Sequence, residues 1–156
     1  MNRLIILAEK CTGCKTCEMI CSLSHEGRCN PVESRIRLIK NEREGINLPL
    51  VCAQCEKPTC KEVCPVAAIF VDRDVVGTDA VKCVGCRMCV LNCPIGATVM
   101  NPVTHEIIRC DLCGGDPLCV KYCPEEAIQF GPIDVVDARI RRERVKHLVS
   151  FLGGMP

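Results

Sequence analysis

Residues 83–94 read Cys83-Val84-Gly85-Cys86-Arg87-Met88-Cys89-Val90-Leu91-Asn92-Cys93-Pro94, and the spacing of the four cysteines decides the fold. The C-x2-C-x2-C-x3-C-P run is a signature of [4Fe–4S] ligation. A cubic cluster needs thiolates at the corners of a tetrahedron, and three close cysteines on a tight loop reach three corners. We expect the fourth cysteine to start a short helix that points away and to ligate a neighbouring cube. The proline after it suits a first helical turn, where no N–H is needed.

Three further groups of four cysteines lie around this third group, and two of them also end in Cys-Pro. The first group is Cys11, Cys14, Cys17 and Cys21; the second is Cys52, Cys55, Cys60 and Cys64; the fourth is Cys110, Cys113, Cys119 and Cys123. The second and fourth groups have extra residues between their second and third cysteines. We interpret these as longer loops that still close on three corners. The sequence therefore predicts four clusters, with a three-cluster version as the alternative.

Two other uses of so many cysteines fit less well. Structural zinc sites usually separate two close pairs by a dozen or more residues, and zinc has no use for the x3-Cys-Pro ending. Disulfides need an oxidising compartment. The N-terminal apolar run is short and leads directly into a cysteine motif without a cleavage site, and no later run is long enough to span a bilayer. We therefore expect a cytoplasmic chain with reduced thiols and no direct membrane span.

Charge and motifs exclude several classes of function. Lys plus Arg is 20 and Asp plus Glu is 19, which gives no electrostatic basis for binding nucleic acid. The sequence has no G-x-G-x-x-G and no G-x-x-x-x-G-K-[ST] motif for a nucleotide. No nucleophile–base pair is recognisable, so we expect no catalytic residue on this chain. Ligation by four cysteines leaves no iron open to substrate, which indicates redox transfer.

The segments after the second, third and fourth groups repeat, with terminal cysteines 29 and 30 residues apart (64 to 93, 93 to 123). Each unit is predicted as a cluster loop, one helical turn and a short strand. Paired strands are predicted at 69–72 and 75–78, and at 97–101 and 106–109. An insertion at 22–51 separates the first two groups, and it is predicted to form a hairpin of strands 35–40 and 46–51.

Beyond residue 131 the pattern becomes helical. Apolar residues over 133–152 recur near helical spacing and the opposite face is basic. Asp134 suits the N-cap, and Gly153-Gly154 suits the end. Three interpretations stay open for this basic helix: packing over the cluster core, docking a partner, or contact with a membrane surface.

The order and spacing of the four groups resemble the four-cluster subunits of the dimethyl sulfoxide reductase iron–sulfur family, over residues 1–131. The segments Glu9–Glu18, Ser22–Gly27 and Asn30–Ile36 look most like the small subunits of tungsten-dependent aldehyde oxidoreductases. The resemblance implies an α+β fold of two fused bacterial ferredoxin-like halves, each with two [4Fe–4S] clusters. A four-cluster domain would cover 1–131, and a C-terminal helix and tail would cover 132–156. One departure is Ser22, which stands where the other groups have proline.

In that family the first group pairs with the fourth and the second with the third, which implies four ligand sets in this chain. They are set one (Cys11, Cys14, Cys17, Cys123), set two (Cys21, Cys110, Cys113, Cys119), set three (Cys52, Cys55, Cys60, Cys93) and set four (Cys64, Cys83, Cys86, Cys89). Single electrons would hop from cube to cube. The resemblance also implies a hetero-oligomer with a catalytic tungsten- or molybdenum-pterin subunit and a third component such as a flavin subunit. The alternatives are a nickel carbon monoxide dehydrogenase or hydrogenase as partner, a free polyferredoxin, or a redox sensor.

Other residues have two interpretations each. Cys29 lies outside every group and is predicted to be a spare thiol. The three histidines share no ligand spacing, and we interpret them as structural or solvated. Seven basic residues flank predicted ligands: Lys15, Lys57, Lys61, Lys82, Arg87, Arg109 and Lys121. They either raise cluster potentials and attract an acidic partner, or form the polar outer face of the loops, which we favour.

Overall fold

The computed structural model describes residues 2–132. Eight short strands in this range form four antiparallel pairs. They are β1 (Asn2–Ile6) with β8 (Ile128–Pro132), β2 (Ile36–Asn41) with β3 (Ile46–Val51), β4 (Ile69–Asp72) with β5 (Val75–Thr78), and β6 (Val99–Met100) with β7 (Ile107–Ile108).

The helices are short, and each α-helix carries cysteines of one group. The α-helices are α1 (Thr16–Glu26), α2 (Thr59–Glu62), α3 (Met88–Leu91) and α4 (Leu118–Lys121). Single 3-10 turns occur at η1 (Ala8–Lys10), η2 (Pro31–Glu33) and η3 (Leu112–Gly115). The result is a small mixed α/β fold with short strands and few helices.

The predicted position of the helical turn is wrong in the second, third and fourth groups. The turn does not follow the last cysteine; α2, α3 and α4 contain the third cysteine and end before the fourth. Proline explains the order, because it disfavours helical backbone at the cysteine before it and so ends the helix there. In the first group Ser22 replaces proline, and α1 continues through Cys21 to Glu26.

The hairpin predictions differ in accuracy. The pair β4–β5 has the predicted bounds, and β2–β3 differs by one residue at its first strand. The strands predicted at 97–101 and 106–109 shorten to two residues each. The N-terminal apolar run, which was not predicted as a strand, is β1, and it pairs with β8 from the other end of the described chain.

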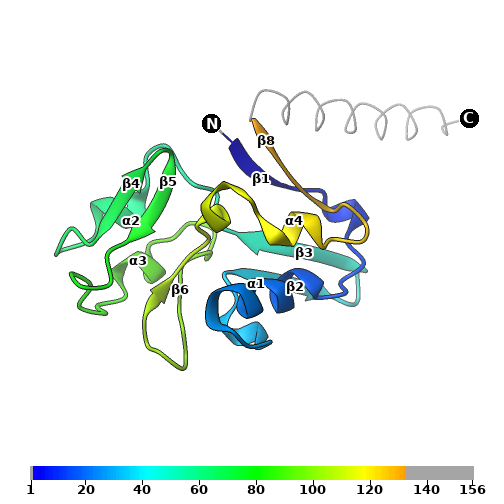
Figure 1. Cartoon of the computed structure of the whole chain (residues 1–156), viewed down its shortest axis with the longest axis horizontal. Coiled ribbons are helices and arrows are strands. Elements are labelled where there is room, and N and C mark those ends of the chain that lie inside the picture. The colour runs from blue at the N-terminus through cyan, green and yellow to red at the C-terminus, as the bar shows by residue number, and fades with distance from the viewer. Residues whose placement is uncertain (1, 133–156) are drawn as a thin grey trace, which may run out of the picture.

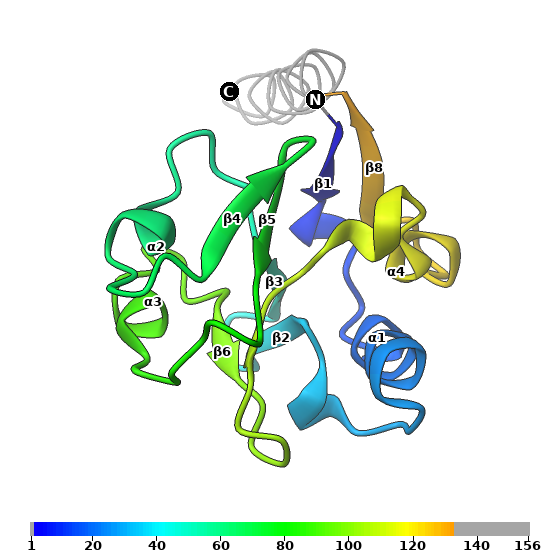
Figure 2. The same cartoon turned by 60° about the vertical axis from the view of Figure 1, so that its left-hand side comes forward.

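The elements gather into two lobes. Figures 1 and 2 both show α2, α3 and the β4–β5 hairpin on one side, and α1, α4, β1 and β8 on the other. Helix α1 packs against α4, and α2 packs against α3. The pairs therefore join the first group to the fourth and the second to the third.

Two further predictions concern helices. Within residues 2–132 no helix has the length and apolar character needed to cross a membrane. The basic helix predicted over 133–152 lies outside the described residues.

Candidate metal centres

The predicted ligands collect in two apolar clusters, one in each lobe. The first contains buried Cys17, Cys21, Cys110 and Cys119, with Cys52 and Cys123 packed against it. The second contains buried Cys89, with Cys60, Cys64 and Cys83 packed against it. Cysteines more than ninety residues apart in sequence therefore share one core, as Cys17 and Cys119 do.

Three cavities are each lined by four cysteines. One has Cys11, Cys14, Cys17 and Cys123 in its wall. A second is lined by Cys21, Cys110, Cys113 and Cys119. A third is lined by Cys64, Cys83, Cys86 and Cys89. In each cavity three cysteines come from one group and the fourth comes from the paired group.

The remaining four predicted ligands line none of these three cavities, and three of them, Cys52, Cys55 and Cys60, belong to the second group. Burial raises the pKa of the Cys52 thiol, and the nearby thiols of Cys60 and Cys55 raise it further. Cys93 lies at the end of the third group, and its burial is partial. Cys29 is exposed and lines none of the three cavities described above.

The last cysteine of three groups has the same backbone surroundings. The N–H groups of Ala68, Ala97 and Ala127 donate to the Sγ atoms of Cys64, Cys93 and Cys123, each at 3.3 Å. The residue before each donor has a positive φ: 48° at Ala67, 67° at Gly96 and 50° at Glu126. The repeat seen in the sequence is thus also a repeat of backbone conformation that directs an N–H at a sulfur atom.

In the first group the last cysteine accepts a hydrogen bond from a different N–H group. Arg35 N–H donates to Cys21 Sγ at 3.4 Å from the start of the inserted hairpin. Burial opposes ionisation of Cys21, Cys64 and Cys93, but hydrogen bonds outweigh it and lower the pKa of each thiol. Such bonds favour the thiolate, which is the form that ligates metal.

In three other buried cysteines, by contrast, the pKa of the thiol is raised. Burial, together with the charge of neighbouring cysteines, raises the pKa of Cys17 and of Cys119 to about 12. Burial also raises the pKa of Cys110. Thiols packed this closely ionise together only beside a strong positive charge, which the iron atoms of a cluster supply. The donor sets therefore fit thiolate-ligated clusters, and they fit poorly with a role as ordinary core residues.

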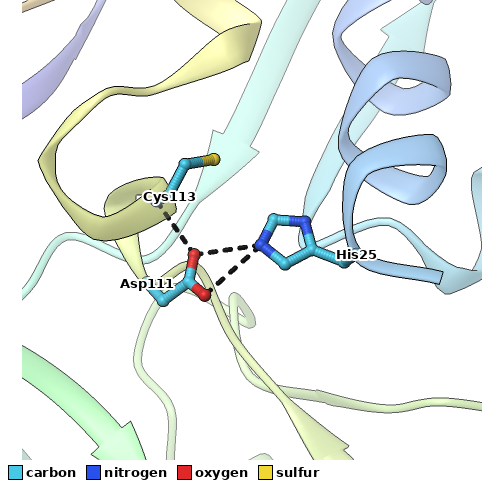
Figure 3. Close-up of side chains that lie close together, drawn as sticks. All are labelled: His25, Asp111 and Cys113. Atoms are coloured by element: carbon cyan, nitrogen blue, oxygen red, sulfur yellow. Dashed lines mark hydrogen bonds and ion pairs between the residues drawn. The ribbon is translucent and has the colours of Figure 1, made fainter. Parts of the chain in front are cut away.

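An ion-pair network fastens α1 to the loop of the fourth group (Figure 3). His25 Nε2 lies 3.2 Å from an oxygen of Asp111, and Arg35 Nη1 donates to the other oxygen at 2.7 Å. Asp111 also accepts from the Cys113 N–H at 3.0 Å and so caps η3. The hydrogen bond with Asp111 raises the pKa of His25 to about 10. Burial opposes ionisation of Asp111, but the bonds from His25 and Cys113 hold its pKa at about 2.

Potential ligand atoms of His25, Asp111 and Cys113 lie within 4.8 Å of one another. Both Asp111 oxygens already accept hydrogen bonds from cations, so we assign the three residues to a structural network and not to a separate metal site. This agrees with a structural role for His25.

Three buried polar residues were missed or undervalued by reasoning from the sequence. Glu33, Gln54 and Arg109 are 0%, 1% and 4% exposed. Each contacts residues that are distant in sequence, and Arg109 contacts predicted ligands. No local pattern distinguishes them from surface residues, apart from the position of Arg109 beside Cys110.

Comparisons with known proteins identify the chain's relatives. The family model described as "4Fe-4S dicluster domain" matches residues 43–133, and "4Fe-4S binding domain" matches residues 8–24. The polyferredoxin-like subunit of the aliphatic sulfonate oxidoreductase of Pyrococcus furiosus is 41% identical over 124 residues, which cover 78% of this chain and 71% of the relative. The electron transport protein HydN of Escherichia coli K12 is 37% identical over 156 residues, covering 82% and 87%.

Two further relatives are subunits of enzymes. One subunit of the anaerobic dimethyl sulfoxide reductase of Escherichia coli K12 is 35% identical over 148 residues, covering 81% of this chain and 71% of that subunit. A subunit of the active-site complex BamBC of benzoyl coenzyme A reductase, as isolated, superposes with a TM-score of 0.52 and 25% identity over 96% of this chain and 90% of that subunit. The chain therefore belongs to the 4Fe-4S dicluster family, as a non-catalytic electron-transfer subunit that binds [4Fe–4S] clusters.

Proposed function

We propose that the chain relays single electrons through four cubes held by the four crossed ligand sets. Set one is Cys11, Cys14, Cys17 and Cys123; set two is Cys21, Cys110, Cys113 and Cys119; set three is Cys52, Cys55, Cys60 and Cys93; set four is Cys64, Cys83, Cys86 and Cys89. The observation that carries this proposal is the composition of the three cysteine-lined cavities. Each joins three cysteines of one group to one cysteine of its paired group, as crossed ligation requires.

The path of the electron follows from the packing of the sets. Sets one and two share the apolar cluster of one lobe, and that of the other contains three cysteines of set four and Cys60 of set three. Cys52 of set three packs against the first cluster, which brings sets two and three together across the lobes. Among the sixteen proposed ligands, only Cys14 of set one and Cys86 of set four are exposed. We therefore order the relay as one, two, three, four, with electrons entering and leaving at its two ends.

The crossed sets also support the proposed domain structure. Residues 1–131 would form one four-cluster domain of two fused ferredoxin-like halves, with the hairpin at 22–51 inserted into the first. Each half would be closed by ligands from both ends of its sequence span. Loss of clusters should then unfold the domain, because metal ligation replaces much of the usual core.

The chain is proposed to work in a hetero-oligomer beside a catalytic subunit. Relatives named as subunits of sulfonate and dimethyl sulfoxide enzymes support such a partner. We retain a tungsten- or molybdenum-pterin subunit as the proposed partner, with a flavin subunit as a further component. A nickel enzyme and a free polyferredoxin remain the rival assignments.

Elemental analysis of the complex purified anaerobically from its native host tests both parts of this proposal. After subtraction of the partner's iron, four cubes require about sixteen irons per chain, and about twelve would leave one set empty. Tungsten or molybdenum in the same sample supports the pterin partner, and nickel would replace it with a nickel enzyme. A chain that purifies alone, with full iron and neither metal, would point to a free polyferredoxin.

A further inference from the structure

Arg109 differs from every other basic residue that flanks a proposed ligand. Six of the seven, at positions 15, 57, 61, 82, 87 and 121, are exposed, as expected for the outer face of the loops. Arg109 is 4% exposed, although it lies directly before Cys110 at the end of β7. Burying a guanidinium is costly unless opposite charge compensates it, so its neighbours need an explanation.

The neighbours of Arg109 are thiols of sets three and four. Its Nη1 donates to Cys60 Sγ at 3.2 Å. The charge of Arg109 also counters the effect of burial on the pKa of the Cys89 thiol. Its positive charge also acts on Cys52 and Cys64. Cys52 and Cys60 belong to set three, and Cys64 and Cys89 to set four.

The guanidinium has further donors to offer. Nε and Nη2 of Arg109 are buried, and within the described part of the chain neither has a hydrogen-bond partner. None of the ion pairs formed among residues 2–132 includes Arg109. The guanidinium presents several N–H donors in one plane, it lies between sulfur-rich centres, and no carboxylate within this range pairs with it. Such a group is suited to bind a negatively charged neighbour.

We propose that Arg109 is the shared counter-cation of the cubes of sets three and four, and that it raises the reduction potentials of both. One-electron reduction adds negative charge to a centre whose four thiolates already make it negative, so a buried cation stabilises the reduced form more than the oxidised form. The other flanking basic residues are exposed. His25 is a largely buried cation beside Cys21 of set two, but it forms an ion pair with Asp111, whereas Arg109 is in none of the ion pairs formed among residues 2–132. Arg109 therefore favours electrons in the half that contains sets three and four.

The inference rests on the proposed ligand sets, and its test is an anaerobic redox titration followed by electron paramagnetic resonance. The native holoprotein is compared with R109Q and R109K. In R109Q the ratio of reduced to oxidised cube at a fixed potential should fall about tenfold or more for two cubes, a shift of about 59 mV for one electron. The other two cubes should keep their potentials. R109K retains the charge without the planar set of donors, so it should shift the same two cubes by less.

Matched controls separate this role from surface charge and from folding. R87Q and K61Q each remove one exposed cation beside a ligand of set four or set three, and both should leave all potentials unchanged. The inference is overturned if R109Q with full iron keeps native potentials, if all four cubes shift equally, or if the controls shift as much. If R109Q loses iron, R109M replaces it as the neutral variant, because native potentials in R109M with full iron would also overturn the inference. Iron content and the number of reduction steps in the native chain test the four-cube proposal independently.

Discussion

Gln54 is a buried side chain that joins three distant parts of the chain. Its Nε2 donates to the Cys110 carbonyl at 2.6 Å, and its Oε1 accepts from the Val76 N–H at 2.8 Å. The first bond reaches the loop of the fourth group and the second reaches β5, while Gln54 itself lies in the loop of the second group. One amide thus links both lobes, at the point where the proposed sets two and three would approach each other.

Replacing Gln54 by leucine should destabilise the holoprotein by about 3 kcal/mol, because a buried N–H and a buried carbonyl lose their partners. The measurement is the guanidinium midpoint at which visible cluster absorbance is lost under anaerobic conditions. N92L is the control, since the exposed Asn92 amide also donates to a carbonyl, that of Met88. If the midpoint of Q54L were as close to the native midpoint as that of N92L, Gln54 would not stabilise the contact between the lobes.

Glu33 is a fully buried carboxylate that ties the insertion to the loop after β6. Arg28 donates to it at 2.7 and 2.6 Å, Asn30 at 2.8 Å, and Asn101 at 3.4 Å. The bonds from Arg28 lower the pKa of Glu33 to about 2 from an ordinary value of 4.5. The fold therefore stabilises the ionised form, and this stability is present above pH 4.5 and lost as the pH falls toward 2.

E33Q should lose its clusters severalfold faster than the native chain in denaturant at neutral pH. The difference between the two proteins should stay constant from about pH 8 to about pH 6, because Glu33 is fully ionised across that window. E44Q is the matched control, since exposed Glu44 accepts a single hydrogen bond, from Asn41, among residues 2–132. A difference that already shrinks between pH 8 and pH 6 would show that Glu33 titrates higher than its contacts imply.

At the scale of elements, the sequence predicted those features that depend on interactions between residues close together in the chain. The polar turn at Arg73-Asp74 between two short runs predicted the β4–β5 hairpin, and cysteine spacing predicted the four loops. The pairing of β1 with β8 was missed because its strands lie at opposite ends of the described chain and neither carries a turn signal. The roles of Arg109 and Gln54 could not be predicted for the same reason, because their contacts are with residues far away in the sequence. The four ligand sets remain a prediction that the cavities support.

The two-residue turn of β4–β5 has an unfavourable sequence. Arg73 and Asp74 both have positive φ, 44° and 69°, between the paired residues Asp72 and Val75. This is the geometry for which Asn-Gly is preferred in hairpins. R73N/D74G should therefore stabilise the chain by about 1 kcal/mol, measured by the same cluster-loss midpoint. D74A keeps a Cβ atom and should give no gain, so an equal gain in D74A would refute the conformational explanation.

At the scale of the whole molecule, the proposed crossed sets would make each end of the described chain depend on the other. Set one closes when Cys123 reaches the loop of Cys11, and β8, five residues after Cys123, pairs with β1. Ligation and strand pairing therefore close the same lobe. This arrangement predicts that two cysteines of one set act as a unit even when more than a hundred residues separate them, whereas neighbours in one group do not.

Single substitutions test that prediction directly. C11S and C123S should remove or alter the same cube in the paramagnetic resonance spectrum, because both belong to set one. C119S lies four residues before Cys123 but belongs to set two, so it should alter a different cube. C29S is the control and should leave all cubes intact, since Cys29 is exposed and outside the groups. If C119S and C123S instead produce one common lesion while C11S produces another, each group ligates its own cube, and the relay order proposed for the two lobes fails with it.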